Sequence, residues 1–239
     1  MTALINIEVN TVEALTLIPI GSGSSIALLH HTGLWRAEDV PYGSVDESRL
    51  FGIGLDAQLR ILWVQDYGRA EAVRILGGTR IANTLEFVLA EGQVETVDAP
   101  AVLSLAVADG ALGSTVPITD PLGMPSPRAF SRSGAGVALA GTLQTSAGNE
   151  AWVARYAGSL LGTPGFRKSF ASDIGTAGFE AIALDSVGDL YVQGRSDGPL
   201  LDAPAATDAF LLKLSTNSRL LWRRSRERTL SGVSCTPPA

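Results

Sequence analysis

Residues 208–222 read Asp-Ala-Phe-Leu-Leu-Lys-Leu, then a polar turn, then Leu-Leu-Trp, and the arrangement recurs near the start of the chain. In both places an aromatic residue and a tryptophan stand twelve positions apart: Phe210 with Trp222, and Phe51 with Trp63. Self-similarity of this kind indicates a fold built from stacked copies of one small unit. The repeat therefore carries the prediction of the fold.

Two fainter copies complete the series. Residues 151–156 read Ala-Trp-Val-Ala-Arg-Tyr, and residues 103–107 read Leu-Ser-Leu-Ala-Val. The four anchors follow one another at 52, 49 and 58 residues: Phe51, Leu103, Trp152 and Phe210. This spacing lies near or above the forty to fifty residues of a four-stranded propeller blade.

A second motif alternates with the first. Residues 183–194 read as a strand, a tight turn and a strand, and residues 133–141 match the second half of that motif. Residues 21–29 and 85–90 are weaker counterparts. Each repeat therefore contains two hairpins, which make four short strands and one blade.

Local chemistry agrees with strands. Phe210, Leu212 and Leu214 alternate with less apolar neighbours, which is the period of a strand. Gly110 and Gly188 can supply the positive φ that a hairpin turn requires. No convincing helical stripe of eleven or more residues occurs, and the nearest candidate, 69–76, is interpreted as a strand.

We therefore predict an all-β, β-propeller-like fold of about four blade-like repeats, each of four antiparallel strands. Residues 1–228 are expected to form one domain, followed by a flexible tail, 229–239. Residues 4–9 alternate like a strand and could close a ring by pairing near 220–224. The alternative, which we favour, is an incomplete arc of a larger propeller with exposed edges.

The repeated aromatic residues are predicted to be packing anchors buried between adjacent sheets, because a ligand site would break the symmetry of the repeat. They are Phe51, Trp63, Trp152, Phe210 and Trp222.

Composition narrows the class of protein. A net charge of −6 argues against general nucleic-acid binding, which requires a basic surface. Only 18% of residues are charged, as expected where blades bury both faces. No run of eighteen apolar residues predicts a transmembrane helix. The first residues lack a signal peptide, so the protein is either cytoplasmic or missing its natural beginning. Cys235 has no internal disulfide partner.

Residues 208–222 resemble the SBBP (seven-bladed β-propeller) repeat of bacterial secreted proteins, and 183–194 resemble the other half of that repeat. The resemblance implies a β-propeller, usually on exported or surface proteins, without an established catalytic centre. It therefore implies an extracellular or cell-surface location. Residues 54–63, Gly-Leu-Asp-Ala followed by Trp63, are similar to the quinoprotein-like propeller repeat, which ranks second.

Catalytic and metal-binding motifs are scarce. The sequence has no nucleophile elbow, no phosphate loop and no paired cysteines, and it indicates no cofactor. His30 and His31 are the only histidines, and on a strand they point to opposite faces, so we interpret them as blade-edge residues. Asp185 and Asp189 flank a tight turn, but a Ca²⁺ loop needs more oxygen ligands.

Basic residues gather near the end of the chain, where five arginines could form a docking patch for phosphate, a lipid headgroup or an acidic glycan. They are Arg219, Arg223, Arg224, Arg226 and Arg228. The alternative is a solvated edge strand whose basic side chains block pairing. The stretch 215–222 is also similar to a degenerate Asp box, which is a structural turn.

Two classes of function remain. The first is a non-catalytic scaffold that binds a protein or glycan partner through the loops at one end of the blades. The second is a propeller hydrolase or lyase acting on a polysaccharide. The residues expected at the blade ends are three dipeptides that share no chemical character: Gly141-Thr142, Gly194-Arg195 and Ala90-Glu91. We therefore favour the scaffold.

Overall fold

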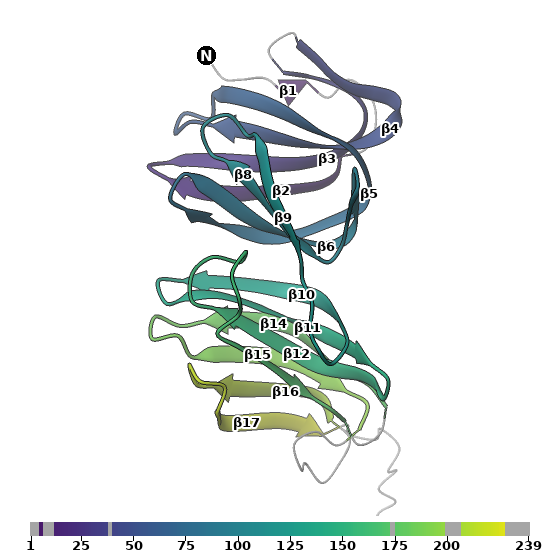
Figure 1. The fold of residues 1–239 in the computed structure, drawn as a ribbon, viewed down its shortest axis with the longest axis vertical. Helices are drawn as coiled ribbons and strands as arrows, with labels where there is room; N and C mark the ends of the chain where they lie inside the picture. Colours follow the sequence, from purple (N-terminus) through teal and green to yellow (C-terminus); the bar gives the residue numbers. More distant parts are fainter. Residues whose placement is uncertain (1–4, 7–11, 38–39, 173–174, 199–206, 228–239) are drawn as a thin grey trace, which may run out of the picture.

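The computed structural model describes residues 5–6, 12–37, 40–172, 175–198 and 207–227 (Figure 1). These residues form strands and no helix, and hence none that could cross a membrane. The strands are β1 (Ile5–Asn6), β2 (Val12–Gly21), β3 (Ser24–Ala37), β4 (Val40–Leu55), β5 (Ile61–Ile81), β6 (Thr84–Val94), β7 (Val97–Asp98), β8 (Ala101–Ala106), β9 (Leu112–Pro117), β10 (Met124–Ser133), β11 (Gly136–Thr145), β12 (Gly148–Tyr156), β13 (Phe166–Phe170), β14 (Ala177–Leu184), β15 (Leu190–Ser196), β16 (Thr207–Leu214) and β17 (Leu220–Glu227).

Fifteen of these strands form four antiparallel sheets of four, and the two-residue strands β1 and β7 pair with the ends of β3 and β6. The third is β10-β11-β12-β13 and the fourth is β14-β15-β16-β17. The first two share the long strand β5: residues 61–69 pair with β4 and complete β2-β3-β4-β5, whereas residues 70–81 pair with β6 and begin β5-β6-β8-β9. The prediction of four blade-like repeats, including a strand at 69–76, is confirmed.

The repeat anchors occupy equivalent places, each on the third strand of its sheet. Phe51 lies on β4, Leu103 on β8, Trp152 on β12 and Phe210 on β16. Each is paired with the second strand, where its partner is Leu29, Phe87, Gly141 or Gly194, respectively. The spacing of 52, 49 and 58 residues is therefore the length of one sheet with its connections.

Hairpin turns repeat one hydrogen-bonding scheme. The Asp56 carboxylate accepts hydrogen bonds from the Gln58 and Arg60 amides, and the Asp185 carboxylate accepts them from Val187 and Asp189. Such side chains favour turns because they satisfy backbone donors locally. Gly188 has a φ of 92° and Gly110 a φ of 75°, which confirms the prediction of positive φ at both glycines.

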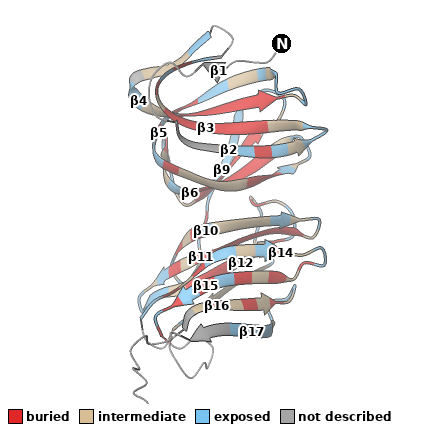
Figure 2. Cartoon of the chain, turned by 180° about the vertical axis from the view of Figure 1, so that it is seen from behind, coloured by how far each residue is buried: buried red, intermediate tan, exposed pale blue. Residues whose placement is uncertain are grey.

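Packing between sheets follows the alternation of side chains along each strand. On β6, Phe87 points toward the first sheet and Val88 toward the third. The same alternation on β11 and β12 directs Trp152 to the second sheet and Val153 to the fourth. Red segments run along the central strands in Figure 2. The second and third sheets thus bury both faces, which agrees with the low content of charged residues.

The interface between the third and fourth sheets joins small residues to large ones. Alanines of β11 and β12 form one side, and aromatic rings of the fourth sheet form much of the other. The Phe179 ring lies 5.6 Å from Phe210 and 5.7 Å from Phe170, in edge-to-face geometry. Such pairs add stabilisation beyond the buried area.

The outer face of the first sheet is covered by the end of its own β3–β4 hairpin. Trp35 stacks on Tyr42 at 4.9 Å and meets the edge of Phe51 at 5.3 Å. Since Phe51 is paired with Leu29, six residues before Trp35, the hairpin must curl back over the sheet. Trp35 is fully buried, although it lies outside the repeat and was not predicted as an anchor.

Long-range polar contacts tie loops to the sheets. The buried Glu86 carboxylate on β6 accepts hydrogen bonds from the Ser159 hydroxyl at 2.7 Å and the Leu160 amide at 2.5 Å. Tyr67 donates a hydrogen bond to the Gly110 carbonyl at 3.0 Å. Each contact holds a connection of one sheet against another strand.

The predicted aromatic anchors differ in their surroundings. Trp152 and Phe210 are buried between adjacent sheets as expected. Phe51 is also buried, but it lies beneath the β3–β4 hairpin of its own sheet and not between two sheets. Trp63 is partly buried, and its indole N–H donates to the Val107 carbonyl at 3.1 Å. For Trp222 the prediction is wrong: it is 38% exposed on β17. No described sheet covers the outer face of the fourth sheet, where the Trp222 ring forms an edge-to-face pair with Tyr191.

The interpretation of the histidines as blade-edge residues is also wrong. Both lie on β3, which is paired on both sides, and both are buried. The His30 Nε2 atom is 3.2 Å from the Ala70 carbonyl oxygen. Neither ring nitrogen of His31 has a hydrogen-bonding partner within the described residues. They point to opposite faces, as expected.

The described strands form an open row, with the first and fourth sheets at opposite ends of the molecule (Figure 1). Ile5 and Asn6 pair with Arg36 and Ala37 of β3. Closure of a ring through residues 4–9 requires these residues to pair with the last sheet. Ile5 and Asn6, the two of them that the structure describes, pair with β3 instead, so this prediction is wrong for them. The proposed tail 229–239, with Cys235, lies outside the described residues.

Candidate functional site

Two charged residues stand at equivalent β-bulges on the first strands of the third and fourth sheets. Pairing of β10 with β11 shifts between Pro127 and Ala129, which leaves Arg128 unpaired in the ladder. Pairing of β14 with β15 shifts in the same way at Glu180. A bulge re-aims the side chain of the extra residue and is common beside functional sites. The two residues are 52 residues apart, one repeat length.

Glycines opposite the bulges explain the local geometry. A Cβ atom on Gly141 would lie 2.1 Å from the Ser126 carbonyl oxygen, and one on Gly194 would lie 2.1 Å from the Gly178 carbonyl oxygen. Any side chain there would push the bulged strand away. On Gly178 a Cβ atom would lie 2.6 Å from Thr142 Cγ2, so this glycine allows the third and fourth sheets to approach.

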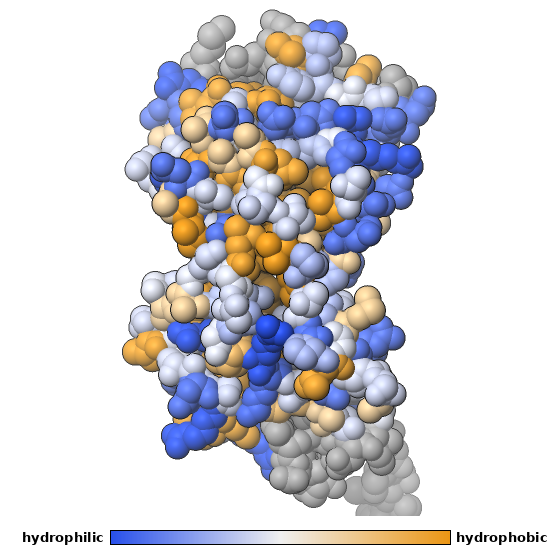
Figure 3. All heavy atoms as spheres, in the orientation of Figure 1, coloured by the Kyte–Doolittle hydropathy of each residue, from blue (hydrophilic) through white to orange (hydrophobic). Residues whose placement is uncertain are grey.

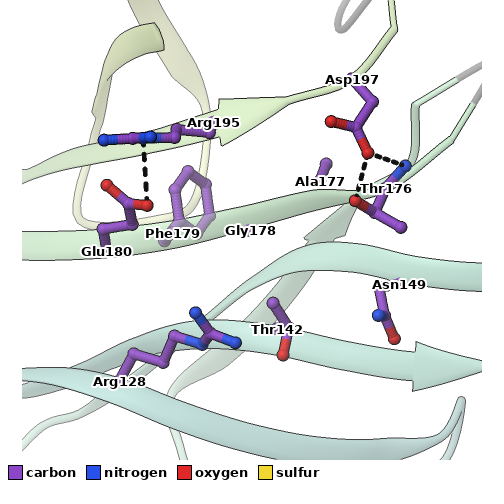
Figure 4. Close-up of a pocket in the computed structure, with 10 residues that line it drawn as sticks. All are labelled: Arg128, Thr142, Asn149, Thr176, Ala177, Gly178, Phe179, Glu180, Arg195 and Asp197. Atoms are coloured by element: carbon purple, nitrogen blue, oxygen red, sulfur yellow. Dashed lines mark hydrogen bonds and ion pairs between the residues drawn. The ribbon is translucent and has the colours of Figure 1, made fainter. Parts of the chain in front are cut away.

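A pocket of about 170 Å³ lies between the ends of these two sheets (Figure 4). Strands β10, β11 and β12 supply one side, and β14 and β15 with the residues flanking them supply the other. The lining residues are Arg128, Thr142, Asn149, Thr176, Ala177, Gly178, Phe179, Glu180, Arg195 and Asp197.

The two carboxylates of the pocket are held by neighbours. Arg195 Nε lies 3.2 Å from Glu180 Oε1. Thr176 donates to Asp197 Oδ2 from its hydroxyl at 2.6 Å and from its amide at 3.2 Å. Both contacts lie within the fourth sheet and its flanking loop, so they fix one wall of the pocket. An exposed ion pair such as Arg195–Glu180 contributes little to stability.

The opposite wall carries a different charge. The Arg128 guanidinium points into the space between the sheets (Figure 4). In the described part of the chain, no carboxylate oxygen lies within 4 Å of it. Thr142 and Asn149 stand beside it on the same wall. The pocket therefore presents an arginine without an ion-pair partner opposite a paired Glu180–Arg195 couple.

Of the three blade-end dipeptides noted in the sequence, two meet in this pocket through Thr142 and Arg195. The third is one sheet away, where Glu91 pairs with Arg74 at 2.5 Å. Arg74 also donates a hydrogen bond to the carbonyl of Pro127, next to Arg128. Sequence reasoning missed Arg128 and Glu180, although their spacing of one repeat is a signal that could have identified them.

The predicted arginine patch lies elsewhere, on and before the edge strand β17. Arg223 is opposite Leu212 and Arg224 is opposite Leu211, so their side chains point to opposite faces of the sheet. Arg219 precedes the strand, and its amide donates to the Ser215 hydroxyl in a structural turn. Arg226 is described only by its backbone pairing, and Arg228 lies outside the described residues. The anionic-ligand patch stays a prediction.

Asp185 and Asp189 face a cation from the chain itself. Lys213 Nζ lies 3.0 Å from Asp189 Oδ2 and 3.9 Å from Asp185 Oδ2, and 4.8 Å from the centre of the Tyr191 ring. Hydrogen bonds to Tyr191 and Asp189 raise the pKa of Lys213. Within the described residues no three His, Cys, Asp or Glu side chains are grouped to hold a metal.

Two solved structures are similar to this chain over most of its length. The first, BamB from Moraxella catarrhalis, is 13% identical with a TM-score of 0.37, covering 90% of this chain and 79% of that one. The second, a member of the DUF4221 family from Bacteroides vulgatus, is 10% identical with a TM-score of 0.40, covering 94% and 84%. Neither likeness bears on function at these values. No protein-family model matches the sequence, and no curated protein matches it.

Proposed function

We propose that this protein is a non-catalytic β-propeller-like scaffold that binds a partner through the ends of its blades. The observation that carries the proposal is the pair of equivalent bulges that direct Arg128 and Glu180 toward one inter-sheet pocket. Rigid sheets that present polar side chains at one end are a common way to build a binding surface. The resemblance of 183–222 to the SBBP repeat supports a secreted or cell-surface bacterial protein.

The alternative is an enzyme acting on a polysaccharide. Hydrolysis of a glycosidic bond generally uses two carboxyl groups that flank the bond, one of them as an acid. In the pocket, Glu180 is paired with Arg195 and Asp197 accepts two hydrogen bonds from Thr176. Both carboxylates thus serve to order one wall. This arrangement favours binding over bond cleavage.

The test measures binding and turnover on the same samples. The purified protein is run through native gels that contain acidic or neutral polysaccharides, and each polysaccharide is also assayed for new reducing ends and for the ultraviolet absorbance of unsaturated products. We expect retarded migration with at least one polysaccharide and no product from any of them. Product formation that is lost in Glu180→Gln would overturn the proposal and establish the enzyme.

A further inference from the structure

The Arg128 guanidinium lines the pocket and has no ion-pair partner among the described residues. A guanidinium is planar and always protonated, and its fork of N–H donors matches a carboxylate in a bidentate pair. Arg128 extends from a bulge and points between the sheets (Figure 4). A ligand that carries a carboxylate therefore has a suitable partner on this wall.

The other polar groups require more than a negative charge. Glu180 is an acceptor across the pocket from Arg128, and its Oε1 atom lies 3.2 Å from Arg195 Nε. Asn149 offers an amide, which both donates and accepts. A purely anionic ligand would be repelled by Glu180, whereas hydroxyl groups could donate to it. The ligand therefore combines a carboxylate at one end with hydroxyl donors at the other.

Size and surface restrict the ligand further. A volume of about 170 Å³ is below the roughly 300–1,000 Å³ of sites for drug-sized molecules, so the pocket suits a single ring. Phe179 is the one aromatic residue of the lining, and its ring is buried against Phe170 and Phe210. The pocket thus lacks an exposed ring on which a neutral sugar could stack. Charge and hydrogen bonds must select the ligand.

We propose that the pocket binds a uronate residue of an acidic polysaccharide, with the sugar carboxylate on Arg128 and ring hydroxyls on Glu180 and Asn149. This inference rests on the proposed function as a binding scaffold and names the class of its ligand. A glutamate-rich peptide shares the carboxylate but lacks the hydroxyl donors that the opposite wall accepts.

The experiment is isothermal titration calorimetry of the full chain with four probes: oligogalacturonate, its methyl ester, a neutral gluco-oligosaccharide of equal length and poly-L-glutamate. Two variants are compared. Arg128→Ala removes the guanidinium, and Arg132→Ala is a matched control on the same strand, exposed, outside the pocket and with the same change in net charge. Far-UV circular dichroism melts check the fold of each.

We expect oligogalacturonate to bind the wild type and Arg132→Ala equally, and Arg128→Ala about tenfold or more weakly, the loss typical of one charge-assisted hydrogen bond. The methyl ester removes the ligand carboxylate that Arg128 is proposed to bind, so this comparison uses the wild type and does not depend on the folding of a variant. The ester should bind as weakly as the neutral oligosaccharide.

Equal binding by the ester and the acid, equal binding by Arg128→Ala, or no binding of oligogalacturonate would overturn the uronate site and leave the scaffold proposal standing. If poly-L-glutamate binds as tightly as oligogalacturonate, the ligand class is an acidic peptide and not a sugar acid. A different result would refute the scaffold proposal. If the calorimeter cell contains cleaved oligosaccharide after the titration, the protein is catalytic.

Discussion

Replacing two tryptophans of the repeat, Trp152 and Trp222, one at a time by alanine should give very different losses of stability. Trp152 is 1% exposed between the second and third sheets, and Trp222 is 38% exposed on the outer face of the fourth. Both belong to copies of the same sequence unit. Their difference lies in whether a neighbouring sheet covers the ring.

The size of each loss follows from burial. Trp152→Ala removes a fully buried ring and leaves a cavity, which typically costs about 3–5 kcal/mol. Trp222→Ala removes an exposed ring that forms an edge-to-face pair with Tyr191, at 6.1 Å between ring centres. Such a pair contributes about 0.5–1.5 kcal/mol. We therefore expect a difference of at least about 1.5 kcal/mol between the variants.

A polar contact adds to the cost at Trp152. Its indole N–H donates to Asp120 Oδ2 at 2.9 Å, and Asp120 lies in the connection between the second and third sheets. Trp152→Phe and Asp120→Ala, alone and combined, form a double-mutant cycle that isolates this contact. Because Asp120 is only half buried, we expect a coupling free energy of about 1 kcal/mol.

The assay is equilibrium unfolding in urea, followed by far-UV circular dichroism so that the loss of a tryptophan does not alter the signal. The free energy of unfolding is obtained from the midpoint and slope of each curve. If Trp222→Ala destabilises the protein as much as Trp152→Ala, burial between sheets does not decide the role of these residues, and the reasoning is wrong.

Three further outcomes are expected. Glu86→Ala breaks two hydrogen bonds to the loop between β12 and β13 and should lower the free energy of unfolding by about 3 kcal/mol, with faster amide exchange in that loop. Burial raises the pKa of Tyr67, because the folded protein favours the neutral phenol. The free energy that this preference adds to folding is fully present below the ordinary tyrosine pKa of about 10 and is lost as the pH rises above it. Tyr67→Phe should therefore reduce the fall in the urea midpoint between about pH 9 and 11. Gly110→Ala would place a Cβ atom 2.5 Å from the Trp63 ring at positive φ and should cost more than about 1 kcal/mol, whereas Gly134→Ala, with no atom within 4 Å, should change the midpoint little.

Local and periodic features of the fold could be read from the sequence. Alternation of apolar residues at 210–214 identified β16, and the glycines at 110 and 188 identified tight turns, because both signals act within a few residues. The spacing of the anchors identified the number of sheets, because each sheet requires about the same length of chain. These properties need no knowledge of which surfaces meet.

Contacts between distant segments were decided by the tertiary structure. Alternation along a strand shows that one face is apolar, but it does not show whether another sheet covers that face. Trp222 was therefore predicted to be buried and is exposed, whereas His31 was placed at an edge and is buried. The pocket depends on the same kind of contact: Arg128 and Glu180 are a full repeat apart in the chain, and only the packing of the third sheet on the fourth brings their bulges to one site.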